Sequence, residues 1–483
     1  MIALPAADGL TLVLAVPAVS AAILALLPGY RITARLNVLA SFLTLVAALS
    51  LLWRRPEPGL LLHVDDLNIV FVVLNTFVGF TTSAFSASYI AHEIETGRLT
   101  PAYLRFYHAM YQALMFEMNL ALVANNLGLM WVGVEFATLT TVLMVGIYRT
   151  HQALEAAWKY FILGSVGIAL ALFGTILLYM AARPVAGQEI EAMAWTALML
   201  RAAGFDPELL NLAFVFLLLG YGTKVGLAPM HGWLPDAHAE GPTPISAVLS
   251  GLLLNVALHA LLRFKMLLAT NGQAIAPGQL MVAMGLISLL FAAFMLYRRR
   301  DIKRMFAYSS IEHMGIIAFA FGMGGPLANF AGLLHMTMHS LTKSAIFFSV
   351  GHIAQVKGTQ NMTEIGGLTA THPVLGWGLV AGVVAIAGLP PFGLFMSEFL
   401  IITSTFARAP LLAVLFVAGV VLALGALLGK LNGLAFGEPK GRLAPVEASY
   451  VPMFAHFALV LAAGVFLPAE LVAWFQAVAR LLG

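Results

Sequence analysis

Cysteine is absent from the 483 residues, and charged residues make up only 10% of them. Without cysteine the chain cannot form disulfides, ligate iron–sulfur clusters through thiolates or use a thiol nucleophile. We therefore expect no cofactor in the chain itself, so that any redox chemistry belongs to a partner. The net charge of +3 is small for this length and predicts no nucleic-acid partner.

Several catalytic and nucleotide-binding motifs are also missing. The chain has no G-x-x-x-x-G-K-[ST], which excludes an ATP-driven pump of the P-loop kind. It has no G-x-S-x-G and no H-E-x-x-H. A dinucleotide-binding fold would require a parallel sheet that this composition cannot supply.

Apolar residues, in contrast, make up 61% of the chain. A bilayer core takes roughly 20 helical residues to cross, and apolar runs of that length recur almost from end to end. We predict an all-α polytopic membrane protein in a single membrane domain, with about fourteen transmembrane helices. The expected spans are 9–28, 36–53, 67–92, 105–124, 127–148, 156–182, 209–228, 244–267, 279–297, 304–323, 327–356, 373–405 with an interruption, 410–436 and 450–479.

Lysine and arginine in short loops predict the orientation of these spans. The N-terminus lacks the basic region of a secretory signal, so we expect it to belong to the first span. A chain that starts outside has more basic loop residues on the cytoplasmic side, which places both termini in the periplasm. The cytoplasmic set is Arg31, Arg35, Arg98, Arg105, Arg149, Arg298, Arg299, Arg300, Lys303, Arg304, Lys357, Lys440 and Arg442; the opposite set is Arg54, Arg55, Arg183, Arg201 and Arg408.

Two ionisable residues lie beside glycine and proline breaks within apolar stretches. They are Lys224 in LLLGYGTKVGLAP and Glu398 in LPPFGLFMSEFL. A charge at membrane depth costs about 2.5–3.5 kcal/mol on insertion scales, so it requires a partner, water or a function. Broken helices with charges are typical of ion-handling proteins.

Further acids and amines lie within the first half of the chain. Glu135 either pins helix packing or pairs with Lys224, so that each side chain changes the proton affinity of the other. Lys159 either anchors its span at the membrane interface or takes part in a relay. Glu117 is compatible with a packing role and with a relay role.

Histidines predict the remaining steps of a polar path. Asn255 and His259 lie one turn apart, and His259 is either a packing residue or a proton relay. His335, His339 and Lys343 recur every four residues on one helical face, which indicates a protein interior or a water path. The His spacing also suits a metal, but Lys343 would repel a cation, so we expect no metal site.

Two other polar groups have simpler interpretations. His313 lies near an expected helix start, where capping or an interhelical hydrogen bond explains it as well as transport does. The run APMHGWLPDAHAEGPTP contains His231, Asp236 and His238 and resembles an interfacial turn, because its prolines break any fixed ligand geometry.

Several long motifs carry a resemblance to a known superfamily. In chain order they are WVGVEFATL, KYFILGSVG, GTKVGLAPMHGWLPDAHAEGPTPISAVLSG, DIKRMFAYSSIEHMG, HMTMHSLTKSAIFFSVG and AGLPPFGLFMSEF. They resemble the antiporter-like subunits of respiratory complex I, of Mrp-type cation/proton antiporters and of group 4 hydrogenases. Within this superfamily, EAAWKY, LLLN, GGPL and FMSEF are most similar to the component F family of hydrogenase-4, the type found in formate-hydrogenlyase complexes.

The resemblance implies two inverted five-helix repeats, each with a broken helix, around a hydrated axis. The ranges are 1–104 for N-terminal helices, 105–270 and 275–440 for the half-channel repeats and 441–483 for a C-terminal helix. It also implies that Glu135 and Lys224 form a modulating pair and that Glu398 lies on the exit side. Many relatives have lysine at the position of Asn255, and an amide cannot carry a proton in this pH range.

The expected function is translocation of protons, or alternatively Na⁺, by a subunit of a larger oxidoreductase complex in a bacterial inner membrane. The chain would have no catalytic centre of its own, and other membrane and soluble subunits would supply the driving reaction. It ends soon after its last span, so we expect lateral packing to hold it in that complex. One alternative is the proton-conducting subunit of an inorganic-carbon uptake complex, and another is a structural spacer without a continuous ion path.

Overall fold

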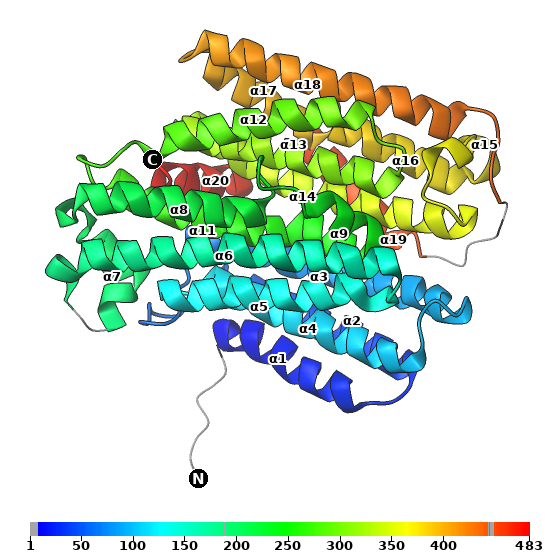
Figure 1. Ribbon diagram of the computed structural model, residues 1–483, viewed down its shortest axis with the longest axis horizontal. Helices are drawn as coiled ribbons and strands as arrows, with labels where there is room; N and C mark the ends of the chain where they lie inside the picture. The colour runs from blue at the N-terminus through cyan, green and yellow to red at the C-terminus, as the bar shows by residue number, and fades with distance from the viewer. Residues whose placement is uncertain (1–7, 188–189, 443, 445–448) are drawn as a thin grey trace. The chain divides into compact units, whose positions relative to one another are not determined.

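A computed structural model describes residues 8–187, 190–442, 444 and 449–483, and these residues are almost entirely helical (Figure 1). Two short π-helical turns, Leu249–Leu253 and Asn432–Phe436, extend α10 and α18. The helices are α1 (Gly9–Leu26), α2 (Tyr30–Ser50), α3 (Asp66–Glu95), α4 (Pro101–Val123), α5 (Leu127–Val145), α6 (His151–Ala186), α7 (Trp195–Met199), α8 (Pro207–Val225), α9 (Leu234–Glu240), α10 (Thr243–Val248), α11 (Leu254–Ala269), α12 (Pro277–Tyr297), α13 (Ile302–Met323), α14 (Gly325–Lys357), α15 (Leu368–Thr371), α16 (Pro373–Ile386), α17 (Gly393–Phe406), α18 (Pro410–Leu431), α19 (Val451–Val465) and α20 (Ala469–Leu481).

Nine helices among the described residues are long and apolar enough to cross a membrane, or ten if the bent pair α19 and α20 counts as one span. The sequence predicted about fourteen spans, a number that these helices do not reach. Part of the difference lies in α13 and α14, which are long but carry many buried polar side chains. The remainder includes α16 and α17, two short apolar helices on either side of an interruption.

Local sequence determines where several of the helices begin. Asp65 caps α3, because its side chain accepts from the Asn68 amide while the Asn68 side chain accepts from the Asp65 amide, at 2.9 Å each. Asp301 caps α13 by accepting from the Arg304 amide at 2.8 Å. The first seven residues, where the sequence predicts no secretory signal, lie outside the described part of the chain.

The described chain divides into two compact units. Unit 1 comprises residues 1–222 and 255–275, and unit 2 comprises 223–254 and 276–483. The expected repeat boundaries at 105–270 and 275–440 stay a prediction. In unit 1, α6 and α8 pack backbone against backbone, since a Cβ at Gly220 would lie 2.4 Å from the Ala171 amide nitrogen. Small residues at such contacts are typical of membrane helix pairs.

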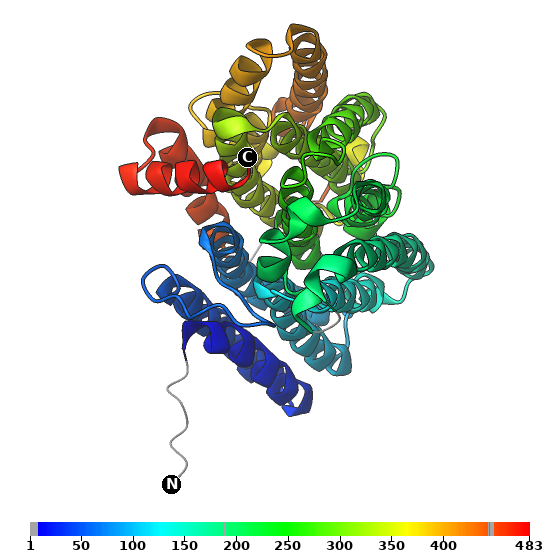
Figure 2. The ribbon, with the colours of Figure 1, turned by 90° about the vertical axis from the view of Figure 1, so that its left-hand side faces the viewer.

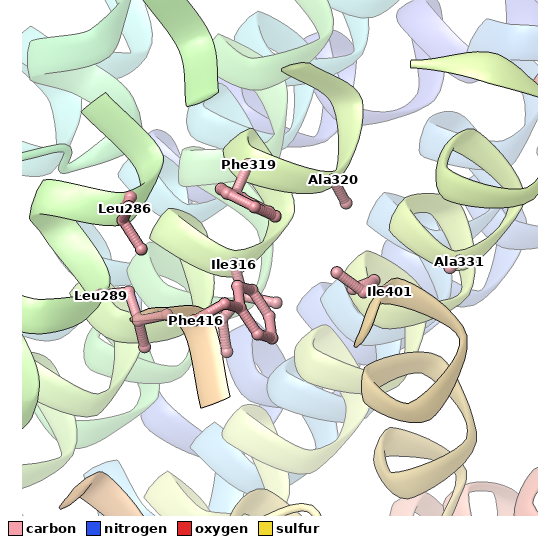
Figure 3. Packing of buried hydrophobic residues seen from close by; sticks show 8 residues of the cluster. All are labelled: Leu286, Leu289, Ile316, Phe319, Ala320, Ala331, Ile401 and Phe416. Atoms are coloured by element: carbon pink, nitrogen blue, oxygen red, sulfur yellow. The ribbon is translucent and has the colours of Figure 1, made fainter. Parts of the chain in front are cut away.

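Unit 2 uses the same device between α12 and α13. A Cβ at Gly285 would lie 2.6 Å from the Gly315 carbonyl oxygen, and the reverse substitution would bring a Cβ within 2.7 Å of the Gly285 oxygen. Larger side chains fill the space beside this contact. Figure 3 shows that core, which contains Leu286, Leu289, Ile316, Phe319, Ala320, Ala331, Ile401 and Phe416.

Two interruptions of the helices lie in unit 2, at the places that the prolines and glycines predict. The first follows α8 and runs to Trp233, with Gly226 at φ 82°. Its backbone groups find partners within unit 2, because the Ala228 amide donates to Ser288 Oγ at 2.8 Å and Trp233 Nε1 donates to the Thr223 carbonyl at 2.8 Å. Such pairing is what permits irregular backbone at membrane depth.

The second interruption lies between α16 and α17 and contains Gly388 at φ 64°. At the end of the chain the single expected C-terminal helix is instead two helices, because α19 and α20 meet at a bend of 82° (Figure 2).

Candidate functional site

Glu398 lies in α17, directly after the second interruption, and is 5% exposed. Its carboxylate packs against Gly388, where an added Cβ would lie 2.0 Å from Oε2. The glycine therefore serves two needs, because it adopts a positive φ and leaves room for the acid. The helix break thus creates the space that the buried carboxylate occupies.

His335, on α14, connects this acid to a second histidine. Its Nδ1 lies 2.9 Å from Ser397 Oγ and its Nε2 lies 2.9 Å from His313 Nδ1. Ser397 in turn donates to the Leu394 carbonyl at 2.8 Å. The expectation that His313 lies near a helix start is wrong, because Asp301 caps α13 and His313 lies in its middle. Its interhelical hydrogen bond is confirmed.

His339 and Lys343 continue the same face of α14, and both are fully buried. The His339 ring lies 5.3 Å from the His313 ring, and neither of its nitrogens has a hydrogen-bond partner among the described residues. Lys343 Nζ donates to the Phe306 carbonyl at 2.7 Å and lies 5.5 Å from the centroid of the Phe306 ring. A carbonyl and an aromatic face therefore stabilise this buried ammonium.

His313, His335 and Glu398 also form a group whose ligand-type atoms all lie within 4.8 Å of one another. The residue types would suit a divalent transition metal. Both nitrogens of His335 are already engaged by His313 and Ser397. His313 and His335 are thus joined by a hydrogen bond with Glu398 beside them, and Glu312 lies close enough to interact electrostatically with Glu398 and Lys343.

The segment expected to be an interfacial turn is a turn up to Trp233 and then continues as the short, largely buried helix α9. In α9, His238 is fully buried and stacks on Phe347 with ring centroids 4.9 Å apart. Lys303, counted above as a loop residue, is 1% exposed and donates to the carbonyls of Ala239 and Gly241 at 3.1 and 2.6 Å. These hydrogen bonds pair the backbone carbonyls at the carboxyl end of α9, where a cation is favourable.

Unit 1 contains a different polar cluster, centred on Arg263 of α11. Its guanidinium donates to both Asp65 carboxylate oxygens, at 2.6 and 2.8 Å, and its Nε donates to His259 Nε2 at 3.1 Å. Burial alone would raise the pKa of Asp65. The Arg263 charge and hydrogen bonds from His63, Arg263 and Asn68 outweigh burial, so the pKa of Asp65 is held well below its usual value.

The other unit 1 candidates occupy three kinds of environment. Glu117 of α4 is 9% exposed and accepts from Thr140 Oγ1 of α5 at 2.9 Å, which is a packing contact. Lys159 is exposed on α6 and pairs with Glu155 at 2.7 Å, which suits anchoring. Glu135 is partly buried in the middle of α5, and Asn255 is buried one turn before His259.

Unit 2 thus brings together His335, His339, Lys343 and Glu398, and it also contains Lys224, which is 2% exposed in the last turn of α8. The Glu135–Lys224 pairing and the step from His259 to α14 would join the two units, and both stay predictions. The sequence reasoning missed Glu312, Ser397, Asp65 and Arg263 as members of these clusters. An acid next to His313 in an apolar run was an available signal for Glu312.

Comparison with known proteins identifies the family. Residues 124–423 match the family described as NADH:quinone oxidoreductase/Mrp antiporter, transmembrane. The chain is 64% identical to the hydrogenase-4 component F homolog of Methylacidiphilum infernorum over 460 residues, which is 95% of this chain and 97% of that protein.

Solved structures share the fold. A chain of the archaeal membrane-bound sulfane sulfur reductase superposes with a TM-score of 0.87 at 22% identity, covering 98% of this chain and 97% of that one. A chain of respiratory complex I from Thermus thermophilus superposes with a TM-score of 0.76 at 25% identity, covering 94% and 97%. These relatives are subunits of multi-subunit membrane complexes. The chain is a multi-span membrane protein and belongs to the antiporter-like subunit family of complex I, Mrp antiporters and membrane-bound hydrogenases.

Proposed function

We propose that the chain translocates protons through the buried cluster of unit 2, as one subunit of a larger oxidoreductase complex in a bacterial cytoplasmic membrane. The observation that carries the proposal is the hydrogen-bonded series His313, His335 and Ser397 beside the buried Glu398. Membrane helices rarely bury this many titratable side chains on facing surfaces without such a role.

The hydrogen bonds explain how a proton can move. A neutral imidazole has one protonated nitrogen and one lone pair, so a proton added at one nitrogen is compensated by loss from the other. His335 contacts His313 through one nitrogen and Ser397 through the other, which is the arrangement that this exchange requires. The serine hydroxyl both donates and accepts, and Glu398 accepts the proton after a small side-chain or water movement.

Lys343 provides the positive charge that determines whether this hydrogen-bonded series takes up or releases a proton. Its ammonium is fully buried and held by the Phe306 carbonyl, so a change in neighbouring charge shifts its balance between ammonium and amine. We propose that the Glu135–Lys224 pair transmits such a change from the partner subunit. His259 and Asn255 belong to the step between the halves, Lys159 and Glu117 serve anchoring and packing, and both termini face the periplasm.

The driving reaction belongs to other subunits. Similarity to a hydrogenase-4 component favours a hydrogenase or formate-hydrogenlyase complex as the assembly, and the chain itself supplies no cofactor. Purification of the intact complex and identification of its subunits separates this assembly from an inorganic-carbon uptake complex.

The direct test is Lys343→Met in the assembled complex, reconstituted into liposomes and supplied with its electron donor. We expect proton translocation to fall at least about 10-fold, because the substitution removes the ionisable group and leaves a side chain of similar length. The matched control is Lys430→Met in the last turn of α18, which should translocate normally. Unchanged translocation in Lys343→Met would instead favour the spacer alternative, and dependence on Na⁺ would identify Na⁺ as the ion.

A further inference from the structure

Arg263 joins three groups from distant parts of unit 1. Its two terminal nitrogens form a fork on the Asp65 carboxylate, and its guanidinium lies 4.4 Å from the centroid of the Trp195 ring. Trp195 Nε1 also donates to the Arg263 carbonyl at 3.0 Å. With 5% of its side chain exposed, Arg263 is a buried cation held in one place by an acid, an aromatic face and its own helix.

Asp65 is held independently of this cation. Its Oδ1 accepts from the Asn68 amide as the cap of α3, and its own amide donates to Asn68 Oδ1. His63 Nε2 lies 3.5 Å from Asp65 Oδ2. The carboxylate therefore stays in position when Arg263 moves, and it is the fixed point of the cluster.

The remaining guanidinium nitrogen determines the state of His259. Because Nε of Arg263 can only donate, His259 Nε2 must accept, which requires a neutral ring with its proton on Nδ1. That Nδ1 is buried and has no hydrogen-bond partner in the described part of the chain. The groups facing the ring are Phe71 from α3, Arg263 from α11 and, beyond the guanidinium, Asp65.

A second proton on His259 is incompatible with this arrangement. It would place a donor against a donor and a cation against a cation, at a separation of 3.1 Å. The conflict is relieved if the guanidinium turns its Nε away from the imidazole and stays on the fixed carboxylate. Protonation of His259 and the position of Arg263 are then two aspects of one switch.

We propose that Arg263 acts as a latch on His259 and controls when this histidine takes up a proton. The latch is closed while Arg263 Nε donates to His259, and it opens when Nε turns away and the guanidinium stays on Asp65. Arg263 and Asp65 are positioning residues in this scheme, since they act through His259. The latch rests on the proposed proton path and adds a controlled step to it in unit 1.

The test is the pH profile of proton translocation by the assembled complex in liposomes. In Arg263→Gln the repelling cation is gone, so His259 binds its proton more readily and the alkaline limb moves to higher pH. In Asp65→Asn the cap of α3 is retained but the anion is lost, so the limb moves to lower pH. We expect shifts on the order of one pH unit in opposite directions.

Two further variants separate the latch from a structural role. Arg263→Lys keeps the charge and should keep the midpoint close to that of the wild type, although it loses the fork. In a His259→Gln background, the shifts caused by Arg263→Gln and Asp65→Asn should vanish, because the responding group is absent.

Absence of opposite shifts, or their persistence without His259, overturns the latch. Its failure is distinguishable from failure of the proposed function. If Lys343→Met abolishes translocation while the pH profiles stay fixed, the path stands and the latch is wrong. If Lys343→Met translocates normally, the proposed path itself is wrong.

Discussion

The two buried histidine clusters differ in what they hold next to the imidazole. In unit 1, His259 faces a guanidinium, which always donates and always carries charge. In unit 2, His335 lies between a second histidine and a hydroxyl, each of which can donate or accept. The first arrangement imposes one protonation state, whereas the second permits exchange. We propose on this basis that conduction in unit 2 uses partners that can reverse their roles, and that control in unit 1 uses a partner that cannot.

The largest effect on the unit 2 side is expected from Gly388→Ala. A Cβ at this position meets Glu398 Oε2 at 2.0 Å, and the positive φ of 64° is unfavourable for alanine by about 1–2 kcal/mol. We expect displacement of the carboxylate and a loss of proton translocation of roughly 10-fold or more, measured in liposomes with the assembled complex.

The matched control is Gly429→Ala in α18, where an added Cβ has no neighbour within 4 Å. This variant should translocate protons as the wild type does. Equal translocation by the two alanine variants would show that the space beside Glu398 has no role in transport.

A smaller effect is expected from Ser397→Ala. The substitution removes one hydrogen-bond partner of His335 and leaves its bond to His313 intact. Loss of such a bond costs about 0.5–1.5 kcal/mol, which corresponds to a decrease in translocation rate of roughly 2–10-fold. The rate of Ser397→Thr should lie nearer to that of the wild type, and an equal decrease in both variants would contradict a role for the hydroxyl.

The smallest effect concerns stability on the unit 1 side. Folding lowers the pKa of Asp65, so its carboxylate stabilises the protein fully above the pKa of the unfolded chain. That contribution is lost as pH falls through the lower pKa of the folded state. Asp65→Asn should therefore cost about 1–3 kcal/mol at pH 7 and much less at pH 3 or below.

Thermal unfolding of the purified complex at both pH values measures this difference. The wild type and the variant should differ at neutral pH and converge in acid. A difference that is the same at both pH values would show that the Arg263–Asp65 pair contributes through packing rather than through charge.

Parts of both clusters could be predicted from the sequence because they are local. The spacing of His335, His339 and Lys343 predicts one buried face, and all three side chains are fully buried. Glycine and proline likewise predicted both helix breaks. The role of these three side chains and of the two helix breaks in transport stays a prediction.

Other parts could not be predicted, because they depend on residues far apart in sequence. Asp65 and Arg263 are separated by 198 positions, and no pattern around Asp65 indicates its partner. His238 was expected in an interfacial turn, yet packing against Phe347 buries it in α9. The number of spans also stays a prediction: nine helices of the described chain, or ten with the bent pair α19 and α20, are long and apolar enough to cross a membrane, because α13 and α14 carry many polar side chains and α16 and α17 are short.

The central claim is that protons cross through the unit 2 cluster, and the most direct measurement is the number of protons translocated per electron pair. Complexes with Lys343→Met and Lys430→Met should be compared in the same liposomes with the same electron donor. The account predicts a lower ratio for Lys343→Met and the wild-type ratio for Lys430→Met. The same ratio in the wild type and in both variants would contradict it.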